Sequence, residues 1–197
     1  MEKIPYEEPF ERPSDENVEK HERNNWRKEV KDWVRSIVIA LVVVFLLNQF
    51  VFNLSTVEGS SMEPTLVENE WLFVNRAVYL LGEPGRGDVV ILEDPKQRYG
   101  EKSKYLVKRI VAVPGDTLEI RNGILILNGE RVSEPYVKSL ALGSSYQHIT
   151  LQKDQYFVMG DNRTNSWDSR DFGPVSIDLI KGRADFILWP MNEWTGL

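Results

Sequence analysis

The longest apolar run of the chain lies between Val34 and Leu54, near the N-terminus. It is interrupted by Arg35 close to its start and by a few amides towards its end. A helix needs about 20 predominantly apolar residues to cross the hydrocarbon core of a bilayer. The run therefore predicts an uncleaved membrane anchor over residues 33–54. A cleaved secretory signal, with an apolar core of about 7–15 residues, fits less well, and a buried helix of a soluble protein remains an alternative.

Residues 1–32 are rich in Glu, Lys, Arg, Asn and Pro and have no periodic apolar face. Such a composition buries too little apolar surface to fold alone, so a disordered tail is expected. Several basic residues flank the apolar run on its N-terminal side, namely Arg23, Arg27, Lys28, Lys31 and Arg35. After the run, the next basic residue is Arg76. The positive-inside rule then predicts a cytoplasmic tail, with residues from about 55 onward on the outer face of the cell membrane.

After the predicted anchor, the apolar runs become short and are separated by turn residues. Short runs between turn signals are typical of β-strands. The apolar runs are WLFV at 71–74, DVVIL at 88–92, YLVKRIVAV at 105–113, ILIL at 124–127 and YFVMG at 156–160.

Three dipeptides predict tight turns between these strands. Asn122-Gly123 and Asn128-Gly129 flank the run 124–127, and both central residues of a type I′ turn need a positive φ, so two consecutive hairpins are expected. Pro114-Gly115 has the order that a type II turn requires. The pattern predicts a mainly β domain over residues 55–197, with residues 119–155 as a candidate small insertion.

Composition excludes several classes of function. The net charge of −6 provides no basic surface for nucleic acid. The absence of cysteine excludes disulfides, thiolate metal sites and a cysteine nucleophile. The two histidines, His21 and His148, are far apart in sequence. We therefore expect no nucleic-acid partner, no metal and no cofactor.

Lys108 lies in the middle of the predicted strand 105–113. Side chains alternate between the two faces of a strand, so Lys108 shares its face with Leu106, Ile110 and Ala112, and Arg109 lies on the other. Burial among apolar neighbours would disfavour the ammonium; a pKa change from about 10.4 towards 8 corresponds to roughly 3 kcal/mol. The resulting neutral amine could accept a proton. In the alternative, Lys108 lies at an edge and extends its amine into water.

Ser61 lies in the polar stretch 59–65, close to the predicted membrane exit. A serine there is most often a turn residue or helix cap, and its hydroxyl becomes a nucleophile only beside a base. Lys108 is favoured as that base, because His148, in a weakly patterned segment, is the single histidine on the outer side. A Ser61–His148 pair remains an alternative. So does a tethered β-rich binding module whose polar loops recognise a partner.

The stretch 159–170, which follows the strand YFVM, is dense in short polar side chains. A solvated loop is the simplest interpretation. The loop could also supply a hydroxyl that orients Lys108, and carboxylates that pair with Arg109 and Arg170. Buried charges need partners of this kind.

Four stretches together resemble, in order, the conserved boxes of bacterial type I signal peptidases. They are GSSMEPTL at 59–66, the run from Arg86 to Val90, KRIVAVPGD at 108–116, and MGDNRTNSWDSR at 159–170. The single anchor, the small insertion and the ending Phe186–Pro190 are similar to the shorter Gram-positive form. The resemblance extends from the anchor to Pro190.

This resemblance implies an antiparallel β-sheet catalytic core with a small inserted β lobe, preceded by one transmembrane helix. It implies a membrane-bound serine endopeptidase that cleaves signal peptides from secretory precursors after small residues. Ser61 matches the nucleophile, Lys108 the general base, and Ser166 the serine that orients the lysine. Four charged residues match family residues that hold the site together: Asp161, Asp168, Arg109 and Arg170. The residues expected to line the substrate cleft are Val57, Gly59, Met62 and Val107.

Gly59 departs from the pattern of some members, which carry at this position a serine that helps to stabilise the oxyanion. The backbone N–H of Ser61 can still donate to the oxyanion. A self-cleaving Ser-Lys repressor would share the chemistry, but it needs an N-terminal DNA-binding domain, and none is visible in the sequence.

Overall fold

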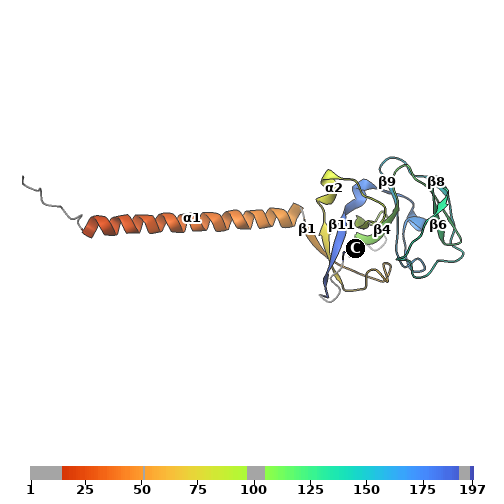
Figure 1. Cartoon of the computed structure of the whole chain (residues 1–197), viewed down its shortest axis with the longest axis horizontal. Helices are drawn as coiled ribbons and strands as arrows, with labels where there is room; N and C mark the ends of the chain where they lie inside the picture. Colours follow the sequence, from red (N-terminus) through yellow and green to blue (C-terminus); the bar gives the residue numbers. More distant parts are fainter. Residues whose placement is uncertain (1–14, 51, 97–104, 191–195) are drawn as a thin grey trace, which may run out of the picture. The chain divides into compact units, whose positions relative to one another are not determined.

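The computed structural model describes residues 15–50, 52–96, 105–190 and 196–197 (Figure 1). The chain divides into two compact units, Met1–Leu46 and Leu47–Leu197. The first unit contains most of one long helix. The second contains all of the strands and short helices.

Helix α1 extends from Asp15 to Phe50. Residues 15–32 are therefore helical, and the expected disorder is wrong for them; residues 1–14 lie outside the described residues. The Glu, Lys and Arg of this stretch are good helix formers, so a polar segment can be helical without a core of its own. The predicted anchor ends too late, because Asn53 and Leu54 pair with strand β2 instead of continuing the helix. Within the described residues, no helix is both long and apolar enough to cross a membrane.

A seven-stranded sheet forms the centre of the second unit, in the order β1-β2-β11-β3-β4-β9-β10. All of its neighbouring strands are antiparallel, which confirms the expected mainly β, antiparallel fold. The strands are β1 Phe52–Thr56, β2 Trp71–Asn75, β3 Val89–Glu93, β4 Tyr105–Ala112, β9 Gln155–Met159, β10 Val175–Ser176 and β11 Ile180–Trp189.

A second, four-stranded sheet forms a small lobe over residues 117–150, inserted between β4 and β9. Its order is β7-β6-β5-β8, with β5 Thr117–Arg121, β6 Ile124–Leu127, β7 Glu130–Arg131 and β8 Tyr146–Thr150. The two predicted hairpins are confirmed, since Asn122 and Asn128 have φ values of 49° and 54° and each is followed by a glycine with positive φ. The lobe ends before the predicted residue 155, because Gln155 begins β9 of the larger sheet.

The apolar core continues from the larger sheet into the small lobe. Val111, Ala112 and Phe157 of the larger sheet pack in one cluster with Leu118 and Leu125 of the lobe. A register shift between Ile110 and Ala112 places Val111 and Ala112 in this same cluster, so the predicted strict alternation fails at the end of β4. Shared packing ties the lobe to strands β4 and β9, which carry or precede the polar stretches singled out above.

The helical elements of the second unit are short. They are α2 Val78–Leu81, α3 Ser169–Phe172 and the 3-10 helix η2 Ile177–Leu179. Helix α3 begins with a capping box, in which Asp168 accepts from the backbone of the first turn and Asp171 accepts from the N–H of Asp168. The cap holds the end of the polar stretch 159–170 against strand β9.

Candidate active site

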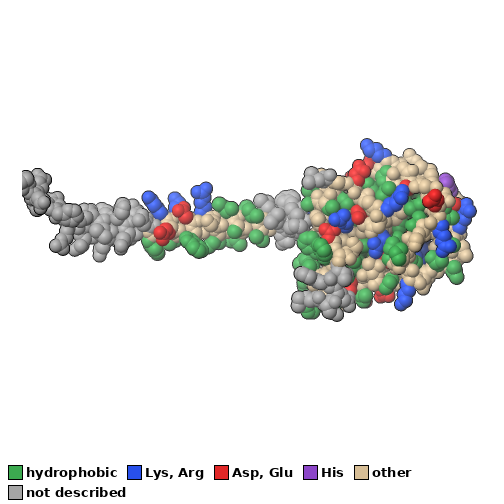
Figure 2. All heavy atoms as spheres, viewed as in Figure 1, with side chains coloured by type: hydrophobic (Ala, Val, Ile, Leu, Met, Phe, Trp, Pro, Cys, Tyr) green, Lys and Arg blue, Asp and Glu red, His purple; other side chains and the backbone are tan. Residues whose placement is uncertain are grey.

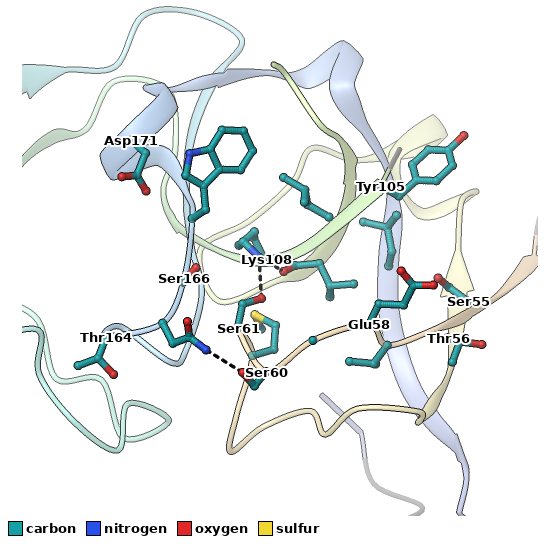
Figure 3. A pocket seen from close by; sticks show the side chains of 18 of the residues that line it. Ser55, Thr56, Glu58, Ser60, Ser61, Tyr105, Lys108, Thr164, Ser166 and Asp171 are labelled. Atoms are coloured by element: carbon teal, nitrogen blue, oxygen red, sulfur yellow. Dashed lines mark hydrogen bonds between the residues drawn. The ribbon is translucent and has the colours of Figure 1, made fainter. Parts of the chain in front are cut away.

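A cleft of about 1030 Å³ opens in the second unit, with Ser61 and Lys108 in its lining (Figure 3). One part of its lining comes from residues 54–62, another from residues 105–108 of β4, and a third from residues 164–167 with Asp171. The three stretches that sequence analysis singled out therefore meet at one place.

Ser61 and Lys108 are in direct contact. Lys108 Nζ donates to Ser61 Oγ at 2.8 Å and to the backbone oxygen of Val107, also at 2.8 Å (Figure 3). The lysine is only 3% exposed, so the alternative with its amine in solvent is wrong. The hydroxyl that would need a base thus lies within hydrogen-bond reach of one.

Burial lowers the pKa of Lys108 from its usual value of 10.5 to about 8. The negative charges of Asp168 and Asp161 act in the opposite direction, but the loss of hydration outweighs them. The change agrees with the expectation from the apolar face of the strand. A usable fraction of the amine is then neutral near physiological pH and free to accept a proton.

Arg109 and Asp161 form a buried ion pair beside the dyad. Arg109 Nε and Nη2 donate to the two carboxylate oxygens of Asp161 at 3.0 and 2.8 Å. Thr65 Oγ1, four residues after the nucleophile, donates to the same carboxylate at 2.5 Å. Arg109 Nη1 donates to the backbone oxygen of Gly87 at 2.7 Å. The pair joins β4 to the loop after β9.

Asp168 and Arg170 form the second ion pair, also through two hydrogen bonds. Arg170 Nε and Nη2 donate to the two oxygens of Asp168, each at 2.8 Å. Asp168 is fully buried and also accepts from the N–H of Gly160 at 3.0 Å. The structure therefore gives both arginines the carboxylate partners that their position requires.

The polar loop after β9 holds the backbone of Ser60 and Ser61. The N–H of Asn162 donates to the backbone oxygen of Ser61 at 3.0 Å, and its side-chain amide donates to that of Ser60 at 3.1 Å. Asn165 Nδ2 donates to Ser60 Oγ at 2.8 Å (Figure 3). Sequence reasoning missed both asparagines, although it had marked the density of short polar residues in this loop.

Ser166 lines the cleft, but its hydroxyl makes no hydrogen bond to Lys108. Its Oγ is buried and has no hydrogen-bond partner among the described residues. Instead it packs closely over the Cα of Gly160. The role of Ser166 in orienting the lysine stays a prediction.

Gly160 permits this packing and was also missed from the sequence. A Cβ on Gly160 would collide with Ser166 Oγ and with the backbone oxygen of Ser61. The second of these is main chain and cannot rotate away. Only glycine lets the loop approach the nucleophile so closely, and a glycine placed directly after a strand was the available signal.

The four residues expected to contact substrate, Val57, Gly59, Met62 and Val107, all line the cleft. Gly59 has a φ of 81°, in the left-handed region that favours glycine, which accounts for the residue at this position. The structure places His148 on β8, exposed and outside the cleft lining, so a Ser61–His148 pair is wrong. Among the described residues, no group of three His, Asp or Glu side chains could hold a metal ion.

A serine hydroxyl in contact with a buried amine, in an open cleft of a β domain, is the arrangement of a serine hydrolase. Residues 30–189 match the family described as signal peptidase, peptidase S26. The chain is 40% identical over 185 residues to signal peptidase I S of Bacillus subtilis (strain 168), covering 88% of this chain and 97% of that one. It is 34% identical over 185 residues to signal peptidase IB of Staphylococcus aureus (strain COL), covering 85% and 94%.

The chain therefore belongs to the peptidase S26 family of signal peptidases and is a serine peptidase of the type I signal peptidase class. The resemblance inferred from the four sequence stretches is confirmed. A crystal structure of a signal peptidase I from Enterococcus faecalis V583 is 30% identical to the chain, with a TM-score of 0.43, covering 52% of this chain and 97% of that one.

The lowered pKa of Lys108 predicts the pH dependence of catalysis. If Lys108 is the catalytic base, its neutral amine is the active form, and kcat/KM for a signal-sequence peptide should rise about tenfold per pH unit below pH 8 and level off above it. A pH-rate profile of the purified enzyme measures this limb. A limb centred near the pKa of an ordinary lysine, about 10.4, would contradict the assignment.

Replacing Gly160 by alanine should lower kcat by about 100-fold or more, because the new Cβ displaces the loop from the backbone of Ser61. Gly85→Ala is a matched control, since a Cβ there meets only an ordinary contact with Asp88. Steady-state kinetics and thermal unfolding should be measured for both variants. Wild-type kcat in Gly160→Ala would show that the close approach is dispensable.

Proposed function

We propose that this chain is a membrane-bound endopeptidase that cleaves signal peptides from secretory precursor proteins after small residues, with Ser61 as nucleophile and Lys108 as general base. The observation that carries the proposal is the 2.8 Å hydrogen bond between Lys108 Nζ and Ser61 Oγ. Membership of the signal peptidase family supports the choice of substrate.

In this mechanism the neutral amine of Lys108 removes the proton of Ser61 as Oγ attacks the scissile carbonyl carbon. The C–N bond then breaks, and the ammonium returns its proton to the departing amine. Water, activated by the same amine, hydrolyses the acyl-enzyme and releases the signal peptide. The backbone N–H of Ser61 serves as one donor to the oxyanion, while Gly59 supplies no side-chain donor.

Ser166 orients Lys108 once the lysine has been protonated. An ammonium has three N–H donors, and two acceptors, Val107 O and Ser61 Oγ, already contact Nζ. The buried hydroxyl of Ser166 lines the same cleft and has no other partner among the described residues, so it is suited to accept the third. The pairs Arg109–Asp161 and Arg170–Asp168 support the site through the loop and strand that they join.

The substrate lies extended between the two strand-like walls of the cleft. Within the described part of the sheet, β1 is an edge strand, and the residues that follow it line one wall. An unpaired strand edge can bind an extended peptide through main-chain hydrogen bonds. Val57, Gly59, Met62 and Val107 then contact the residues beside the cleaved bond.

Exposed apolar side chains on α1 support a membrane anchor that begins at residue 33 and ends with the helix at Phe50. The large hydrophobic side chains exposed on this helix include Val34, Ile37, Val38, Ile39, Leu41, Val42, Val43, Val44 and Phe45 (Figure 2). A helical segment that exposes large apolar side chains in succession is suited to contact with lipid. Exposed basic residues precede the run, and they favour a cytoplasmic N-terminus with the second unit on the outer face.

A substrate anchored in the same bilayer would meet the cleft at high effective concentration. Trp71 and Trp189 face each other in register between β2 and β11, and both are about half exposed. Tryptophan is enriched at membrane surfaces, so these two residues suit a domain that works against the bilayer. The bilayer and secretory precursors are therefore the proposed partners.

Ser61→Ala and Lys108→Ala should each reduce cleavage of a secretory precursor in detergent by at least about 1000-fold while leaving the thermal unfolding transition in place. His148→Ala is the control and should keep wild-type activity, because His148 lies outside the cleft. Full activity in either alanine variant would refute the dyad. A wild-type protein that binds precursors without cutting them would favour the binding module.

The full chain should remain in the membrane fraction after alkaline carbonate washing, whereas a chain that begins at Phe52 should be released or soluble. In intact cells or oriented vesicles, a protease added outside should digest the second unit of the full chain. Release of the full chain by carbonate, or digestion only after the membrane is broken, would contradict the anchor or its orientation.

A further inference from the structure

The connection between β7 and β8 of the small lobe contributes a buried carboxylate to the catalytic loop. Glu134 binds Arg163 through two hydrogen bonds, with Nη1 to Oε2 at 2.7 Å and Nη2 to Oε1 at 2.5 Å. The exposed fractions of the two side chains are 6% for Glu134 and 1% for Arg163. This buried ion pair joins the small lobe to the loop that follows β9.

Arg163 in turn is hydrogen-bonded to the backbone near Ser61 and Lys108. Its Nε donates to the backbone oxygen of Gly160 at 3.1 Å, and its own backbone oxygen accepts from Arg170 Nη1 at 2.8 Å. Gly160 is the residue whose Cα packs against Ser61 O and Ser166 Oγ. One side chain, that of Arg163, and the backbone of Gly160 therefore connect the lobe to the backbone of Ser61.

Tyr136 makes a second connection from the same segment. Its hydroxyl donates to Glu134 Oε1 at 3.1 Å. The centroid of its ring lies 4.2 Å from the Cζ of Arg109, in cation–π geometry. Arg109 is the neighbour of Lys108 in β4 and the partner of Asp161. Glu134 thus contacts Arg163, and Tyr136 contacts Arg109.

We propose that Glu134, assisted by Tyr136, is a positioning residue through which the small lobe sets the geometry of the Ser61–Lys108 dyad. The inference rests on the proposed function, because it assumes that this dyad performs the cleavage. Neither Glu134 nor Arg163 lines the cleft, so both act through other residues and not by touching substrate.

The physical reason is the burial of Arg163. A buried guanidinium without a counter-ion is strongly disfavoured, so loss of the Glu134 carboxylate would drive Arg163 towards water. Its hydrogen bond to Gly160 O would then break, and the loop that packs against Ser61 would shift. Catalysis is sensitive to misplacements of about 1 Å, whereas the remaining cleft walls, from residues 54–62 and 105–108, would still bind substrate.

Glu134→Gln keeps the shape of the side chain and removes its charge. We expect kcat to fall by about 10- to 100-fold while KM stays within about twofold. Tyr136→Phe keeps the ring over Arg109 and removes the hydroxyl, so it should cause a smaller loss of kcat. The control is Glu130→Gln, an exposed glutamate of β7 in the same lobe, which should behave as wild type.

A double-mutant cycle separates positioning from general destabilisation. If Glu134 acts through Arg163, then Glu134→Gln combined with Arg163→Met should lose no more kcat than Arg163→Met alone. If the fold-losses in kcat of the two single variants multiply in the double variant, the inference is overturned. A change in KM of Glu134→Gln with unchanged kcat would overturn it as well.

The outcomes for the wild-type enzyme and Ser61→Ala keep the two proposals distinguishable. If the wild type fails to cleave a precursor, or Ser61→Ala cleaves it, the proposed function fails. If both behave as expected and Glu134→Gln keeps full kcat, only the positioning role fails. If Glu134→Gln is unfolded at the assay temperature, the Tyr136→Phe variant is the test instead. An unchanged kcat in Tyr136→Phe would then overturn the role of the lobe.

Discussion

The burial of one amine is the constraint on which the rest of this structure depends. Lys108 can act as a base only if its ammonium is destabilised, and the fold achieves this by leaving the lysine 3% exposed in the middle of β4. Two nearby carboxylates oppose this effect, since Asp168 and Asp161 both favour the charged lysine. Each is paired with an arginine of its own, through two hydrogen bonds. The paired arginines offset part of the charge of the carboxylates, so the loss of hydration dominates and the pKa of Lys108 stays lowered, at about 8.

Local patterns in the sequence were enough to predict the strands and both Asn-Gly hairpins. They also predicted that Lys108 is buried and has a lowered pKa. These features depend on neighbours within a few residues, as in the positive φ of Asn122 and Asn128. Alternation along β4 held as far as Ile110 and failed after it, because the register shift there depends on the partner strand β9. The start of α1 was also misjudged, since a charged segment can be helical without an apolar face.

The supporting residues of the site were harder to predict from the sequence, because their contacts join segments far apart in the chain. Gly160 owes its identity to the backbone of Ser61, and Glu134 to the guanidinium of Arg163 in the loop after β9. No periodicity within either segment records such a contact. Family resemblance identified Ser166 as the orienting serine, yet its hydroxyl makes no hydrogen bond with the described residues, while Lys108 donates to Ser61 and Val107.

The position of β1 at the edge of the sheet bears on how one enzyme could process many unrelated proteins. Main-chain N–H and C=O groups are the same in every polypeptide, so an open strand edge accepts any extended segment regardless of its side chains. Discrimination is then left to the few side chains that must fit beside Ser61. If cleavage follows small residues, as proposed, secreted proteins could diverge in sequence as long as the residues next to the cut stay small. A single copy of such an enzyme could thus serve an entire exported proteome.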